Sequence, residues 1–233
     1  MRIIDISRTI STSTAVWPGD TPFSFRHALR IVDGADYNLT HISMSPHTGS
    51  HADAPWHFDD TGRHPAALPL EPYVGRAHVV SVHRKEGGIV PGDLASFDPA
   101  GIERLLLRTW VSDLADEKWP GDFPFPTPEL VSFLADRGLV LLGADFPSMD
   151  ARDSRDLVCH RLLAARGVAT LENLALAGVP DGVYELIALP LKFAHLCGSP
   201  VRAVLRTLSP EDQECAFDAP MQGLKRETLS LST

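Results

Sequence analysis

The sequence predicts a single α/β domain with some parallel sheet, and three observations lead to this prediction. Its 233 residues fit one ordinary domain that buries its own hydrophobic core. The N-terminal half reads mostly as short strands, and the 19 prolines of the chain favour turns between them. The C-terminal half alternates between strand and helix patterns, which is typical of a parallel sheet covered by helices.

The N-terminal strands are predicted from short runs of apolar and β-branched residues. They are expected at Arg2–Ser7, Tyr37–Met44, Arg76–His83 and the compact buried run Leu105–Trp110. The stretch Asp113–Pro128 is polar and rich in proline, so we expect it to be an exposed loop.

Two helices and four strands are predicted after this loop. Thr127-Pro128-Glu129 offers a capping hydroxyl, a proline in the first turn and an acid near the positive end of the helix dipole, and Gly138 can end that helix. Ser154 is predicted to cap a second helix that ends near Gly167. Strands are expected at Leu139–Ala144, Val168–Glu172, Val183–Leu191 and Pro200–Leu208, and a partly disordered tail over 209–233.

Composition and charge exclude several classes of function. The formal net charge is -9 and no basic run occurs, so a nucleic-acid partner is not expected. No apolar run approaches the roughly 20 residues that span a bilayer, and the N-terminus lacks the pattern of a signal peptide. The three cysteines show no CxxC pair, which favours a cytoplasmic protein without a disulfide framework. Cys159 lies in an apolar segment, where a buried cysteine is more common than a catalytic one.

The strongest chemical signal is a cluster of histidines and one carboxylate with the spacing HxxxHxDxxxH. Its members are His47, His51, Asp53 and His57. On a helix they would spread around the circumference, but on an extended chain all four would point to one face. Imidazole and carboxylate groups suit zinc, and also manganese or iron. The segment therefore predicts a metal site.

A metal site of this kind needs further ligands from elsewhere in the chain. His160 shares a face of the second predicted helix with apolar residues, so it is either an ordinary core histidine or a ligand that faces inward. Glu172 ends a short apolar strand and is either exposed or buried with a partner. Other chemistries lack their motifs, because the chain contains no GxSxG, GxGxxG, GxxxxGK[ST] or HExxH pattern.

The segment His47–Phe58 resembles the signature of the cyclase-type metal-dependent hydrolases, and within them the kynurenine formamidases (arylformamidases) of bacteria. Further blocks that are similar lie at 16–22, 145–148, 185–191 and 199–205. The resemblance covers roughly residues 3–208. It implies one layered β/β/α domain of the swivelling type with a mixed sheet, over 1–208.

The resemblance also implies two divalent metal ions, usually zinc, with manganese as the alternative. By position, His47, His51 and Asp53 would bind the first metal, with Asp53 reaching the second as well. His160 would bind the second metal and Glu172 would contact both. His57 would be the general acid and base, and Trp17 would bind substrate.

The implied reaction converts N-formyl-L-kynurenine and water to L-kynurenine and formate in tryptophan degradation. The resemblance implies a homodimer that acts on a small aryl formamide. Phe146 stands where threonine is common and Trp56 where leucine is frequent, so we expect both to affect the shape of the pocket.

Two alternatives remain open from the sequence. One is a related hydrolase that acts on another aryl or cyclic amide, such as isatin. The other is a metal-binding module without catalysis, against which His57 argues, because a pure binding site needs no spare imidazole.

Overall fold

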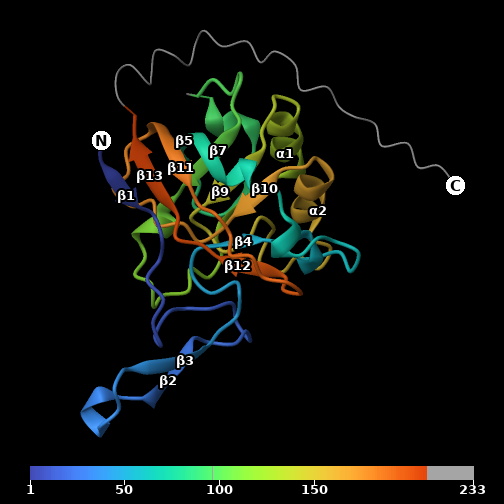
Figure 1. The fold of residues 1–233 in the computed structure, drawn as a ribbon. Coiled ribbons are helices and arrows are strands. Elements are labelled where there is room, and N and C mark those ends of the chain that lie inside the picture. The colour runs from blue at the N-terminus through green and yellow to red at the C-terminus, as the bar shows by residue number, and fades with distance from the viewer. Residues whose placement is uncertain (96, 209–233) are drawn as a thin grey trace, which may run out of the picture.

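The structure is a computed structural model of the chain and describes residues 1–95 and 97–208. The predicted tail 209–233 lies outside the described residues. Within them the chain forms one mixed α/β fold with a seven-stranded sheet and two helices (Figure 1), as the sequence predicts. No helix of this part of the chain is long and apolar enough to cross a membrane.

The main sheet is mixed, with four parallel strands on one side and three antiparallel strands on the other. Its order is β1-β13-β11-β5-β7-β9-β10, and β5, β7, β9 and β10 run parallel. The strands are β1 (Ile3–Asp5), β5 (Val74–Ser81), β7 (Arg104–Arg108), β9 (Leu141–Ala144), β10 (Ala169–Leu171), β11 (Gly182–Ile187) and β13 (Val204–Thr207).

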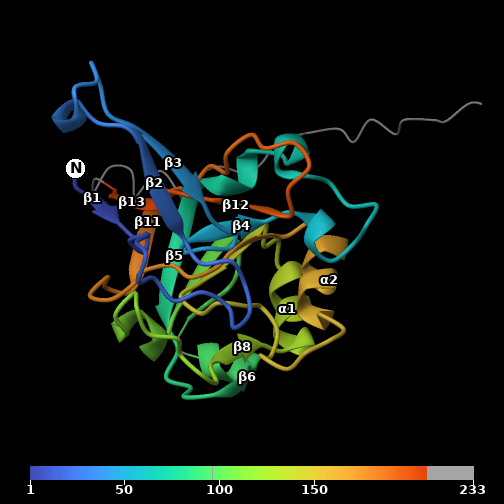
Figure 2. The same cartoon turned by 90° about the horizontal axis from the view of Figure 1, so that it is seen from below.

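Both faces of the parallel strands are buried, which explains their continuous apolar sequences. In β7, Leu105 and Leu107 pack toward the helices α1 (Pro128–Ala135) and α2 (Val158–Ala165), whereas Leu106 packs into the core on the other face. The two helices lie together on one side of the sheet (Figures 1 and 2). The core on the other face includes Ala52, from the segment that also carries His51 and Asp53.

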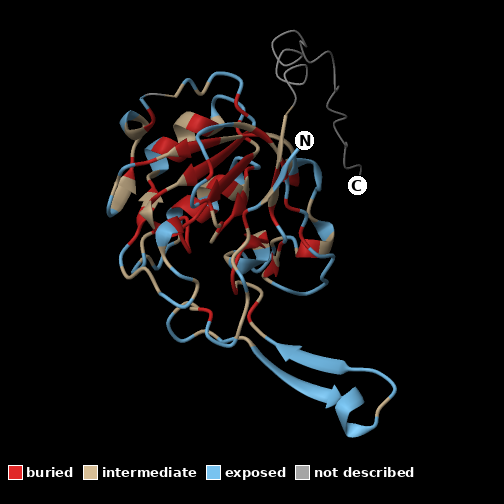
Figure 3. Ribbon diagram, turned by 90° about the vertical axis from the view of Figure 1, so that its left-hand side faces the viewer, coloured by how far each residue is buried: buried red, intermediate tan, exposed pale blue. Residues whose placement is uncertain are grey.

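Six further strands pair outside this sheet. β4 (His51–Asp53) pairs with β12 (Gly198–Pro200), β2 (Ser24–Leu29) with β3 (Leu39–Ser43), and β6 (Gly87–Ile89) with β8 (Pro124–Pro126). The β2–β3 hairpin extends from the body, and every residue of its two strands is exposed (Figure 3).

Most predicted elements are confirmed with shorter bounds. Thr127 caps α1 by accepting a hydrogen bond from the backbone N–H of Leu130, and Gly138 follows in the left-handed conformation with φ 97°. Pro200–Leu208 was predicted as one strand, but it contributes to two, β12 and β13, because the chain between them turns from one sheet to the other.

Two predictions were wrong in their local chemistry. Ser154 does not cap the second helix; its hydroxyl accepts from the N–H of Leu157, in a turn before the helix begins at Val158. Asp113–Pro128 is not simply an exposed loop, because it contains β8, and Phe123 is 2% exposed. The aromatic side chains of Trp119 and Phe123 pack in or against the core, so this segment is ordered against the body despite its polar and proline-rich composition.

Asp145 joins three segments behind the site and is completely buried. Its carboxylate accepts hydrogen bonds from the backbone N–H and the hydroxyl of both Thr109 and Ser112, at 2.6–3.1 Å. The Ser112 hydroxyl in turn accepts from the N–H of Leu176. Burial raises the pKa of Asp145 against the opposing effect of these donors.

We expect Asp145→Ala to lower the free energy of unfolding by about 3 kcal/mol or more, because each buried donor left without a partner costs about 1–3 kcal/mol. Urea denaturation measures this change. Asp113→Ala removes an exposed carboxylate nearby and should change stability by no more than about 0.5 kcal/mol. Equal effects of the two substitutions would contradict a structural role for Asp145.

Candidate metal centre

Backbone pairing places three of the predicted ligands around β4. His51 and Asp53 lie two residues apart on this strand, so their side chains point to the same side. His51 also forms a bridge with Glu172, in which each backbone N–H donates to the other carbonyl at 2.9 and 3.2 Å. The register between β4 and the segment after β10 therefore brings Glu172 next to His51.

His47 and His57 reach the same place by a different route from the one predicted. The chain from 47 to 57 is not extended throughout: His47 lies in a turn, and His57 ends a short 3-10 helix, Pro55–His57. Gly49 permits the turn with φ 67°. The predicted convergence is present, with ring centroids of His47 and His57 4.3 Å apart, but the predicted cause holds only for His51 and Asp53.

Helix α2 brings His160 to the centre from the other side. Its Nδ1 atom lies 2.7 Å from the carboxylate of Asp150, which also accepts from the backbone N–H groups of Cys159 and His160. This contact fixes the ring so that Nε2 faces Asp53 and Glu172, at 3.3 and 3.2 Å. His160 is therefore an inward-facing residue of the site, and Asp150 orients it as carboxylates orient metal-binding histidines.

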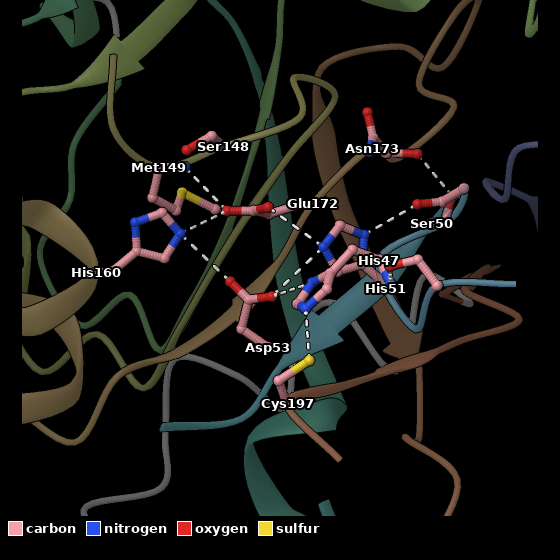
Figure 4. Close-up of polar contacts among 12 residues, drawn as sticks. His47, Ser50, His51, Asp53, Ser148, Met149, His160, Glu172, Asn173 and Cys197 are labelled. Atoms are coloured by element: carbon pink, nitrogen blue, oxygen red, sulfur yellow. Dashed lines mark hydrogen bonds and ion pairs between the residues drawn. The ribbon is translucent and has the colours of Figure 1, made fainter. Parts of the chain in front are cut away.

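The centre is a compact group of two carboxylates and three imidazoles, drawn in Figure 4. Asp53 lies 3.0 Å from His47 Nδ1 and 3.4 Å from His51 Nε2, and Glu172 lies 3.3 Å from His51 Nε2. Asp53 and Glu172 are 5% and 3% exposed, so the alternative of an exposed Glu172 is wrong.

The residues fit a divalent cation on two observations. Within the described part of the chain, both carboxylate oxygens of Asp53 and Nε2 of His51 are buried without a hydrogen bond of normal geometry. The ligand atoms of His47, His51 and Asp53 lie within 4.8 Å of one another, and so do those of Asp53, His160 and Glu172. Nitrogen and oxygen donors of this kind bind zinc and manganese.

The pKa shifts show how strongly the carboxylates attract positive charge. Burial opposes the charged form of His47, but the close contacts with the Asp53 carboxylate and the Cys197 thiol outweigh it and raise the pKa to about 10. The pKa of His51 rises to about 9, since Asp53 and Glu172 again outweigh burial. Burial also opposes the charged form of Asp53, but the surrounding imidazoles hold its pKa well below the usual range. A divalent cation at this centre would stabilise the two buried carboxylates in the same way as protonated imidazoles do.

A cavity of about 630 Å³ opens over this centre. His47, His51, His57, His160 and Glu172 border it, and Trp17 forms part of its wall. The Trp17 ring meets Trp119 edge to face, with centroids 5.2 Å apart. The lining of the cavity therefore includes aromatic residues as well as the polar residues of the centre.

The two unusual residues noted in the sequence do not line the cavity. Phe146 is completely buried and stacks on Phe123, which contacts Trp17, so it supports the wall from behind. The Trp56 ring packs beside His64, 4.8 Å away, and is 37% exposed. Phe146 and Trp56 can therefore affect the shape of the cavity only through the residues that they contact.

Sequence reasoning missed three residues at the site. Asp150 orients His160, Trp119 lines the cavity, and Cys197 lies 3.1 Å from His47 Nε2. Contacts with His47 and His57 lower the pKa of the Cys197 thiol to about 6, against the opposing effect of burial. None of the three lies in a motif, and only the fold brings them to the histidine cluster.

Comparison with known proteins finds relatives over most of the chain. Residues 4–151 match the family model described as "Putative cyclase". Two relatives named "Kynurenine formamidase", from Bacillus cereus and Bacillus cytotoxicus, are 43% and 42% identical over 205 residues. Each alignment covers 88% of this chain and 97% of the relative.

Solved structures show the same fold. One described as "The Structure Of Potential Metal-Dependent Hydrolase With Cyclase Activity" has a TM-score of 0.74 and 26% identity, covering 88% of this chain and 96% of that one. Isatin hydrolase A from Labrenzia aggregata, bound to benzyl benzoate, has a TM-score of 0.73 and 27% identity, covering 88% and 93%.

Proposed function

Because this chain belongs to the cyclase family and is a hydrolase, we propose that its reaction converts N-formyl-L-kynurenine and water to L-kynurenine and formate. The observation that carries the proposal is the pair of buried carboxylates, Asp53 and Glu172, set among histidines that border a cavity with aromatic residues in its wall. The relatives at 42–43% identity that are named for this activity support the choice of substrate.

In this proposal five residues hold two divalent metal ions, zinc first and manganese as the alternative. His47, His51 and Asp53 form one group of ligands and Asp53, His160 and Glu172 form the other. Asp53 and Glu172 each lie near imidazoles of both groups, so their negative charge would offset the repulsion between two cations. Two cations held by these residues would supply Lewis acidity and would lower the pKa of a bound water to about 7.

His57 is the proposed general base and acid. Its ring stands beside His47 at the cavity, and unlike His51 it is exposed, so it can exchange protons. An imidazole nitrogen of His57 takes a proton from the attacking water and returns it to the aniline nitrogen as the C–N bond of the formamide breaks. The aryl ring of the substrate would lie against Trp17 in the cavity wall.

The test is metal analysis combined with an assay of formate release from N-formyl-L-kynurenine by the purified full chain. The proposal expects two equivalents of metal, loss of activity with a chelator, and recovery when zinc or manganese is restored. Hydrolysis that continues at full rate after the metal is removed would contradict it.

A cyclic aryl amide such as isatin is the second candidate substrate. The cavity wall contains no lysine or arginine among the described residues, so it offers no ammonium or guanidinium group for the carboxylate of N-formyl-L-kynurenine, which isatin lacks. The isatin hydrolase with the same fold supports this candidate at lower identity. Comparing kcat/KM for isatin and for N-formyl-L-kynurenine decides between them.

The β2–β3 hairpin supports the proposal that the protein is a homodimer. Phe25 and Ile42 are paired across its strands and are 49% and 55% exposed. A hairpin of two strands is marginally stable in water by itself, and a symmetric contact with a second copy would cover the apolar side of both hairpins.

We expect the double substitution Phe25→Glu and Ile42→Glu to convert a dimer to a monomer at micromolar concentration, because burial of each side chain contributes about 2 kcal/mol. Size-exclusion chromatography with light scattering measures the change. Arg26→Glu, at the neighbouring position whose side chain points to the opposite face, is the matched control and should remain dimeric. A wild-type monomer, or a double variant that remains dimeric, would rule out this interface.

A cytoplasmic location stays a prediction from the cysteine content.

A further inference from the structure

Cys197 joins His47 and His57 in a third group of side chains that could bind a metal, at the cavity surface. One ligand atom from each of the three residues lies within 4.8 Å of the other two. The thiol Sγ is 3.1 Å from His47 Nε2. Neither Cys197 nor His57 belongs to the two groups built on Asp53, so this group shares only His47 with the proposed pair of metal sites.

The backbone holds the thiol in this place. Cys197 immediately precedes β12, and its carbonyl accepts a hydrogen bond from the N–H of Ala54 at 2.9 Å. The next residue, Gly198, pairs with Asp53, and a Cβ atom there would lie 2.9 Å from Cε1 of His47. The close approach of Gly198 to the His47 ring therefore sets the position of the thiol beside that ring.

His47 is shared between the two environments through its two nitrogens. Nδ1 lies 3.0 Å from Asp53 Oδ1, whereas Nε2 faces the sulfur of Cys197. A neutral imidazole has a lone pair on only one of its nitrogens. His47 can therefore bind a cation together with His51 and Asp53, or together with Cys197 and His57, but not both at once.

We propose that His47, His57 and Cys197 form a site for a soft, thiophilic divalent cation, such as Cd²⁺ or zinc in excess. This site competes for His47 with the site formed by His47, His51 and Asp53, called the Asp53 site below. Thiolate and imidazole ligands select soft and borderline cations, whereas carboxylates suit manganese. An occupied site would withdraw a ligand and the proton carrier from hydrolysis. Only this inhibition rests on the proposed function; cation binding by the three side chains does not.

The direct test is a titration of the full-length protein, loaded with manganese, with Cd²⁺ followed by thiolate-to-cadmium charge-transfer absorption in the ultraviolet. We expect a band that saturates at one equivalent in the wild type and is lost in Cys197→Ser. The matched control is Cys159→Ala, which removes the other described thiol, a buried group that donates to the carbonyl of Pro126. This control should keep the band.

A second ligand and a second readout make the test independent of any one variant. His57→Ala should weaken Cd²⁺ binding at least about tenfold, while His64→Ala, whose ring lies outside the group, should not. Excess zinc should inhibit the manganese-loaded wild type, and at least about tenfold more zinc should be needed to inhibit Cys197→Ser to the same fraction of its own rate.

Absence of the band from the wild type, or a band of equal affinity in Cys197→Ser, would overturn the proposal. The variant His51→Ala separates the two proposals, because His51 belongs only to the Asp53 site. It should lose hydrolysis and keep the cadmium band. A protein that shows the band but never hydrolyses the formamide would refute the proposed function and leave the soft-cation site standing.

Discussion

Replacement of Asp53 by alanine should remove both the bound metal and the hydrolytic activity. The Asp53 carboxylate lies 3.0–3.4 Å from nitrogens of His47, His51 and His160, so it is the common member of both groups of proposed ligands. A carboxylate about 4 Å from a unit positive charge contributes about 4 kcal/mol at an effective dielectric constant of 20. We therefore expect metal affinity to fall at least about a thousandfold.

Metal content of the dialysed protein and the rate of formate release measure these two effects. Asp60→Ala is the matched control, since Asp60 is an exposed carboxylate on the nearby loop. It should keep both metal and activity. Full activity in a metal-free Asp53→Ala protein would refute the two-metal proposal, because it would show hydrolysis without the cations.

Replacement of His57 by alanine should instead lower kcat about 10²–10⁴-fold while the metal content stays unchanged. His57 belongs to neither of the two groups of proposed ligands that contain Asp53, and its side chain is exposed. Its loss removes the proposed route for a proton from water to the leaving nitrogen. The pattern of retained metal with lost turnover distinguishes a proton carrier from a ligand.

The matched control is His64→Ala, which removes a histidine of the same segment whose ring packs beside Trp56 and His195. We expect its metal content and kcat to remain close to those of the wild type. Loss of the two catalytic metal ions from His57→Ala would reassign His57 as one of their ligands. An unchanged kcat would show that another group moves the proton.

The sequence was sufficient for the parts of this protein that depend on local chemistry. The apolar run of β7 predicted a buried strand, because a strand covered on both faces needs apolar residues at every position. Thr127 and Gly138 predicted the start and end of α1, since capping depends on neighbouring backbone groups alone. The spacing of His51 and Asp53 predicted that both point to one side of a strand, because side chains alternate between the two faces along a strand.

Only the tertiary structure decided which distant residues complete the centre. His160 could equally have been a core histidine and Glu172 an exposed carboxylate, because spacing within a helix or strand says nothing about what that element faces. The bridge between His51 and Glu172 and the contact of Asp150 with His160 resolve both cases. Cys197 lies 150 residues from His47, so no local pattern could connect them.

The histidine segment shows which of its properties follow from its sequence and which follow from tertiary packing. Its residue types pointed to metal chemistry, since imidazole and carboxylate groups can bind a metal ion in any fold that brings them together. Its conformation was not determined locally: a turn at His47 and a 3-10 helix at His57 replace the extended chain, yet all four side chains still converge. Packing against β12, α2 and the segment after β10 fixes that convergence, because these contacts join residues that the sequence separates by more than a hundred positions.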